Sequence, residues 1–107
     1  MKKAYNADPY DPGIIMHTAG IFMYVGKPSL SEPLYKKLLD IDPLSAMNYM
    51  FMGLGQYFMG HFEKAIEHTQ KSLKIDPDFV YSIFWRPVFL AANNQKHEAL
   101  ELMDQII

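Results

Sequence analysis

An Asp-Pro dipeptide recurs along this chain at a constant interval. Copies stand at Asp8-Pro9, Asp42-Pro43 and Asp76-Pro77, at intervals of 34 residues. A fixed internal period of this length is typical of repeat architectures, in which each unit is one supersecondary structure that buries its apolar face only by stacking on its neighbours. We therefore expect one domain over residues 1–107, built from units at about residues 8–41, 42–75 and 76–107.

The middle unit shows what such a unit contains. Apolar and aromatic side chains recur at three- and four-residue spacing from residue 44 to residue 58, which predicts an α-helix. Gly60 then stands where a left-handed C-cap would satisfy the last carbonyls, so we expect a positive φ there. A second helical pattern starts at Phe62 and stops at Asp76-Pro77, because proline lacks an amide hydrogen and disfavours helical dihedral angles in the residue before it. The unit reads as helix, tight turn, helix.

The neighbouring units repeat this pattern. The first has an apolar segment over residues 14–25, then Gly26, then a helix ending in "LYKKLLDID". The third has an apolar segment over residues 79–92, a turn at Asn93-Asn94 and a final helix from about Lys96. Pro87 falls inside the first helix of the third unit, where it should bend the helix or remove one backbone hydrogen bond. The pattern predicts an all-α fold of antiparallel helix-turn-helix units.

The middle unit resembles the tetratricopeptide repeat, whose period of about 34 residues equals the spacing of the Asp-Pro copies. Its matching positions are an aromatic residue, a Leu-Gly-like pair, the turn glycine, two small residues and the closing proline: Tyr49, Met52, Gly53, Gly60, Ala65, Ser72 and Pro77. The other units depart from the pattern, with Ser31 and Pro33 in the first and Arg86-Pro87 in place of the Leu-Gly pair in the third. The resemblance implies a right-handed superhelical array, and it is silent on the biochemical task because this fold serves many.

The two ends suggest a piece of a longer array. Residues 1–7 are expected to be the end of a preceding helix, since Ala4 precedes the packing position at Leu38 by one period. The last helix carries an apolar stripe that no later helix in the sequence covers: Leu100, Met103, Ile106 and Ile107. A small natural protein with frayed ends is the alternative.

Charge and composition exclude several classes of partner. The net charge is -2, the pI is about 6.0, and lysine and arginine are scattered, so no basic stripe is available for nucleic acid. The longest apolar run, residues 14–25, is too short to span a membrane, and no apolar segment of a signal peptide follows the first lysines. Without cysteine there is no disulfide framework. We expect a soluble, cytoplasmic protein with neither nucleic acid nor membrane as a partner.

The residues that could carry chemistry are dispersed. The four histidines, at positions 17, 61, 68 and 97, are joined by no carboxylate pattern that would complete a metal or proton-transfer site. Gly53 and Gly55 lie in a helical segment and not in a phosphate-binding loop, and no serine has the context of a nucleophile. We expect no enzyme activity, no metal and no cofactor.

The candidate binding surface is the set of first helices, which line the concave face in arrays of the resembled family. Almost none of the residues expected there is charged, so the sequence departs from the family's mode of gripping a terminal carboxylate. Thioethers and aromatic rings instead suit an apolar helix or extended segment. These side chains could alternatively pack against neighbouring helices. The predicted partner-binding residues are Met47, Met50, Leu54, Tyr57, Phe58, Tyr81, Phe84, Trp85 and Val88.

Two functions remain open at this level. The first is a protein-protein interaction scaffold that binds an apolar helix or peptide. The longer segment "LDIDPLSAMNYMFMGLGQYFMGHFEKAIEHTQKSLKIDPDF" also resembles repeat arrays joined to bacterial signalling proteins, which implies a recruiting or regulatory part of a larger protein. The second is a self-assembly module, a homo-oligomer formed through the groove or the uncovered last helix. Arg86, at a position where the resembled family buries leucine, should either extend its head to water or pair with a carboxylate or carbonyl.

Overall fold

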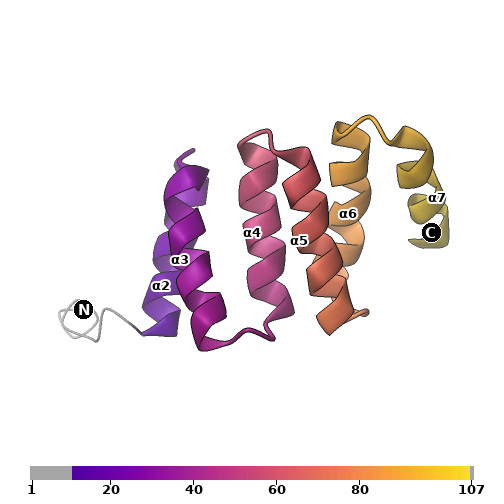
Figure 1. The fold of residues 1–107 in the computed structure, drawn as a ribbon. Helices are drawn as coiled ribbons and strands as arrows, with labels where there is room; N and C mark the ends of the chain where they lie inside the picture. The colour runs from indigo at the N-terminus through magenta and orange to yellow at the C-terminus, as the bar shows by residue number, and fades with distance from the viewer. Residues whose placement is uncertain (1–10, 107) are drawn as a thin grey trace.

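The computed structural model describes residues 11–106, and the described part of the chain is an array of α-helices (Figure 1). Each helix packs against the next one along the chain, and α4 also contacts α6. The array is about 50 Å long and 26 by 22 Å in cross-section. The predicted all-α architecture is confirmed, whereas residues 1–7 and the first Asp-Pro lie outside the described residues. The helices are α2 (Pro12–Tyr24), α3 (Pro28–Ile41), α4 (Ala46–Phe58), α5 (Phe62–Ile75), α6 (Val80–Ala92) and α7 (Lys96–Ile106).

The turns inside the three helical pairs share one backbone geometry. Gly26, Gly60 and Asn94, each one period after the last, have φ angles of 78°, 82° and 62°. The residue after each of them donates its amide hydrogen to the carbonyl five residues back, at 2.8 Å in all three turns. This bond and the left-handed residue before it form a helix C-cap that glycine or asparagine adopts at low cost. The positive φ predicted for Gly60 is confirmed.

The Asp-Pro dipeptides join one pair to the next. Asp42 and Asp76 each follow the last residue of a helix and donate their amide hydrogens to the carbonyls of Leu38 and Ser72, at 2.9 and 3.0 Å. The same aspartates accept hydrogen bonds from the amides two residues later, at 3.2 and 3.0 Å. An aspartate therefore caps the loop locally while the following proline prevents the helix from continuing.

Pro33 and Pro87 lie in the interior of a helix, and neither of them ends it. α3 continues through Pro33, and α6 continues through the buried Pro87. A proline in a helix interior cannot donate to the carbonyl four residues back, which for Pro87 is that of Ile83. α6 therefore continues through Pro87 without this one backbone hydrogen bond, the second of the two outcomes predicted for it.

The core consists of two clusters that meet at α4. One face of α4 contributes Met52 to a cluster with residues of α2 and α3, and another contributes Met50 to a cluster with α5, α6 and α7. Because α4 is buried on both sides, it is the central element that links the pairs. The buried members are Ile15, Ala19, Tyr35, Leu38 and Met52 in the first cluster, and Met50, Ala65, Ile66, Phe89, Leu90 and Ala99 in the second.

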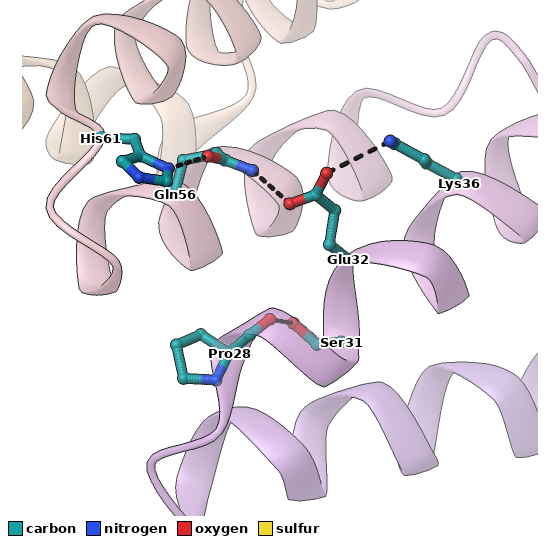
Figure 2. A network of polar contacts seen from close by, with 6 residues as sticks. All are labelled: Pro28, Ser31, Glu32, Lys36, Gln56 and His61. Atoms are coloured by element: carbon teal, nitrogen blue, oxygen red, sulfur yellow. Dashed lines mark hydrogen bonds and ion pairs between the residues drawn. The ribbon is translucent and has the colours of Figure 1, made fainter.

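A polar network connects α3 with α4 (Figure 2). The amide nitrogen of the buried Gln56 donates to Oε2 of Glu32 at 2.7 Å, and the Lys36 ammonium lies 3.2 Å from Oε1 of the same carboxylate. On its other side, Gln56 accepts a 2.9 Å hydrogen bond from Nδ1 of His61. Both ends of the Gln56 amide are thus satisfied, which is what a buried polar group requires.

The joint between α5 and α6 is made by hydroxyls. Ser72 donates to the carbonyl of Ala46 at 2.8 Å, and its Oγ lies 2.6 Å from Oγ of Ser82. With the Ser72 proton directed to Ala46, the Ser82 hydroxyl is the donor to Ser72. Both serines are fully buried, so small side chains and satisfied hydroxyls allow the two helices to approach closely.

Candidate functional site

An apolar groove runs between α6 and α7 and reaches α4. Its cavity volume is about 750 Å³, within the range of ligand sites in proteins. Lys96 is the only charged residue among those that line it, so an occupant would be held by apolar contact. We call this surface the α6–α7 groove; its lining residues are Tyr57, Phe84, Pro87, Val88, Ala91, Ala92, Lys96, Ala99, Leu100, Met103 and Ile106.

The repeat period explains why this groove is open. Phe84 is 56% exposed, whereas Met50, its equivalent one unit earlier, is 1% exposed. Leu100 is 61% exposed, whereas its equivalent, Ile66, is 9% exposed. In the middle unit these positions belong to a core cluster completed by Phe89 of α6. The surface equivalent to the α6–α7 groove is covered by α6 in the middle unit. In the third unit, no helix among the described residues covers it.

The predicted partner-binding residues divide into three groups. Phe58, Tyr81, Phe84 and Val88 are exposed, while Met47, Leu54, Tyr57 and Trp85 are half-buried. Met50 is buried in the core, so its expected place on an accessible surface is wrong: the contact between α4 and α6 covers it. Tyr57, Phe84 and Val88 are the members that line the α6–α7 groove.

Tyr57 and Trp85 have a structural role as well. The Tyr57 ring lies 5.2 Å from that of Phe89 and 6.0 Å from that of Trp85, measured between ring centroids. Trp85 and Phe89 are 5.8 Å apart and stacked. These spacings are typical of aromatic pairs that stabilise a core, so part of each of these half-buried side chains is used in internal packing.

The list of partner-binding residues predicted from the sequence contains none from α7, although self-association through the last helix was considered. Leu100 and Met103 belong to the predicted uncovered stripe, but the groove that they form with Phe84 and Val88 requires the packing angle of α6 and α7. The sequence signal that could have revealed the groove is the repeat period. The equivalents of Phe84 and Leu100 in the middle unit, Met50 and Ile66, lie in the core.

Burial shifts the pKa of two side chains, His68 and Tyr35. The half-buried His68 has its pKa lowered, chiefly by burial and further by the charge of Lys71. Burial raises the pKa of the Tyr35 hydroxyl to about 12. Within residues 11–106, no three histidine or acidic side chains gather closely enough to hold a metal ion. None of the described helices has the length and apolar character needed to cross a membrane.

Known proteins share parts of this sequence. Residues 46–79 match the family model described as tetratricopeptide repeat. A TPR repeat-containing protein of Methanocaldococcus jannaschii is 25% identical over 72 residues, and the Hsp70-Hsp90 organizing protein of Triticum aestivum is 29% identical over 76 residues. These matches cover 67% and 71% of this chain but only 21% and 13% of the two relatives. The chain therefore spans a small part of the length of either relative.

Solved structures share the fold. MamA from Desulfovibrio magneticus superposes with a TM-score of 0.85 at 18% identity, covering 98% of this chain and 59% of that one. A second crystal structure of MamA gives a TM-score of 0.80 at 19% identity, covering 96% and 60%. Identity this low shows the fold alone. The family match confirms the resemblance of residues 46–79 to the tetratricopeptide repeat, and the superposition shows that the described helices share the all-helical repeat fold seen in MamA.

Proposed function

We propose that this chain is a protein-protein interaction scaffold whose α6–α7 groove binds an apolar helix of a partner protein. The observation that carries the proposal is the register of the repeats: the equivalent surface of the middle unit is covered by α6, an apolar helix. A surface that already holds a helix in one unit has the shape and polarity for a helix in the next. Phe84 and Leu100 are exposed and provide apolar surface that a partner helix would bury.

The relatives agree with this class of function. The Triticum aestivum relative is named as an organizing protein of Hsp70 and Hsp90, and tetratricopeptide-type arrays as a class present extended binding surfaces. The resemblance of the middle unit to arrays in bacterial signalling proteins supports a recruiting or regulatory role in a larger protein. The near absence of charge in the groove favours an apolar segment over an acidic terminus as the ligand.

A synthetic peptide with the sequence of residues 78–95 is a suitable probe, since this segment contains the helix that covers the equivalent surface of the middle unit. Titration into the labelled protein should give saturable binding that Val88→Asp and Met103→Lys each weaken. Glu67→Lys, an exposed change on α5 outside the groove, is the control for altered surface charge and should leave affinity unchanged. Absence of saturable binding, or equal affinity in all variants, would contradict the proposal.

Self-assembly is the second candidate, and the opposite end of the array favours it. Ile21 of α2 is 59% exposed, although its equivalents Gly55 and Phe89 are buried against the preceding unit. The two ends of the described array thus expose surfaces that meet inside it. Pairing of α2 with the α6–α7 groove of a second copy would be heterologous, which generates open chains of molecules.

Sedimentation over a concentration series separates the two functions. Self-assembly predicts a mass that increases with concentration and that Ile21→Lys and Met103→Lys each reduce, because they alter opposite sides of one interface. If Met103→Lys abolishes binding of the peptide while the unaltered protein stays monomeric, the groove serves a partner of another kind.

A further inference from the structure

A second cavity lies between α5, α6 and α7. The inference drawn from it does not depend on helix binding in the α6–α7 groove. The volume of this cavity is about 560 Å³. From α6, Ile83 and Arg86 line this cavity, whereas Phe84 and Val88 line the α6–α7 groove. Most of its wall is aliphatic, with one cation and one amide. We call it the Arg86 cavity; its lining residues are Leu73, Pro77, Ile83, Arg86, Leu102, Gln105 and Ile106.

Arg86 is the unusual member of this wall. Its side chain is partly buried, and its Nε is buried without a hydrogen-bond partner. Among residues 11–106, no hydrogen bond or ion pair to its guanidinium is found. Neither of the pairings considered from the sequence, with a carboxylate or with a carbonyl, occurs within this range. A buried donor without a partner is costly, and a guanidinium forms its strongest bonds with a carboxylate or phosphate.

The repeat period allows the lining of this cavity to be compared with the middle unit. In the middle unit the positions of Ile83 and Leu102 are occupied by Tyr49 and His68, whose rings lie 6.4 Å apart. The position of Arg86 is occupied there by the buried Met52.

Lys71, the equivalent of Gln105, lies over the Tyr49 ring at 5.8 Å from its centroid. The corresponding space of the middle unit is thus filled by rings and a methionine. In the third unit smaller aliphatic side chains replace the rings and a guanidinium replaces the thioether. These replacements place smaller side chains at two lining positions and a positive charge at a third.

We propose that the Arg86 cavity binds a small aliphatic monocarboxylate. The carboxylate would accept hydrogen bonds from the Arg86 guanidinium, and the alkyl chain would lie against Leu73, Ile83 and Leu102. A planar guanidinium matches a carboxylate in geometry and charge. One cation in an aliphatic wall favours a ligand with one negative charge and an apolar body, and the volume is within the usual range of small-molecule sites.

Octanoate is the probe, and 1-octanol is the matched uncharged control. Octanoate should bind saturably by calorimetry, and it should shift the methyl resonances of Ile83 and Leu102 but not that of Val88 in the groove. 1-Octanol should bind at least about tenfold more weakly, because it lacks the charge that pairs with Arg86. No saturable binding, equal binding of the alcohol, or shifts confined to the groove would overturn the proposal.

Two variants borrow residues from the middle unit. Arg86→Met introduces the residue found at the equivalent position and should weaken octanoate binding by about tenfold or more. Ile83→Tyr introduces the ring that fills the equivalent space and should block binding while Arg86 is retained. Circular dichroism verifies that each variant is folded. Unchanged octanoate affinity in either folded variant would contradict the proposal. If a variant does not fold, the comparison of octanoate with 1-octanol on the unaltered protein still tests the proposal.

Discussion

Gln56 and Glu32 join the first two helical pairs through one 2.7 Å hydrogen bond from Nε2 to Oε2. Burial by itself would raise the pKa of the Glu32 carboxyl. Hydrogen bonds from Lys36 and Gln56, and the charges of Lys36 and Lys64, outweigh this effect, so the pKa lies below its usual value of 4.5. The contact between α3 and α4 therefore favours the ionised carboxylate.

The first prediction concerns the pH dependence of this joint. Because the folded pKa of Glu32 is below the unfolded one, the stabilisation is fully present above the unfolded value of about 4.5 and is lost as pH falls through the folded pKa. Glu32→Gln removes this contribution at neutral pH. Urea unfolding should show the variant less stable than the unaltered protein at neutral pH, with the difference shrinking in acid. A difference independent of pH would show that the charge of Glu32 does not stabilise the joint.

The second prediction concerns the turn between α4 and α5. Gly60 has a φ of 82°, and a Cβ added there would meet no neighbouring atom within 4 Å, so the cost of a substitution is conformational. Gly60→Val should lower the free energy of unfolding by about 1 kcal/mol or more. Gly20→Ala, in the open interior of α2 without a positive φ, is the matched control and should be neutral or stabilising. Equal effects of the two changes on the melting temperature would contradict the left-handed turn.

The third prediction compares two glycines of α4. A Cβ at Gly53 would lie 3.1 Å from the backbone carbonyl of Ala65 and 3.3 Å from Cβ of His68, whereas one at Gly55 would meet its nearest neighbour, Ser31, at 3.6 Å. Gly53→Ala should therefore destabilise the fold by about 1 kcal/mol or more, because α4 and α5 must separate. Gly55→Ala should be tolerated, since alanine is the better helix former. Thermal unfolding of the pair tests the ranking, and a more stable Gly53→Ala than Gly55→Ala would reverse it.

The fourth prediction compares the stabilising roles of two neighbouring aromatic residues of α4. The ring of the half-buried Tyr57 contacts four other aromatic rings, those of Phe58, Phe62, Trp85 and Phe89. Tyr57→Ala should cost about 3 kcal/mol through lost packing. Phe58→Ala, at an exposed site, should cost well under half as much. Chemical denaturation of both variants gives the comparison. Similar losses would show that Tyr57 is not the centre of this cluster.

The sequence determined the architecture because its signals are local and repeated. A helix end needs a residue that tolerates positive φ, and Gly26, Gly60 and Asn94 recur at one interval; a unit end needs a stop, and aspartate followed by proline supplies it. Three-four spacing of apolar residues then indicates which segments are helical. None of these features depends on knowing what a helix packs against.

Tertiary structure decided which apolar side chains are free. Met50 and Phe84 occupy equivalent positions and look alike in the sequence, yet α6 covers Met50, while Phe84 is left exposed within the described residues. The joining of α7 to the groove and the opening of a cavity beside Arg86 likewise depend on how three helices meet. The physical reason is that the burial of a side chain depends on whether another helix packs against it. Periodicity places a residue on a face, but only packing determines whether another helix covers that face.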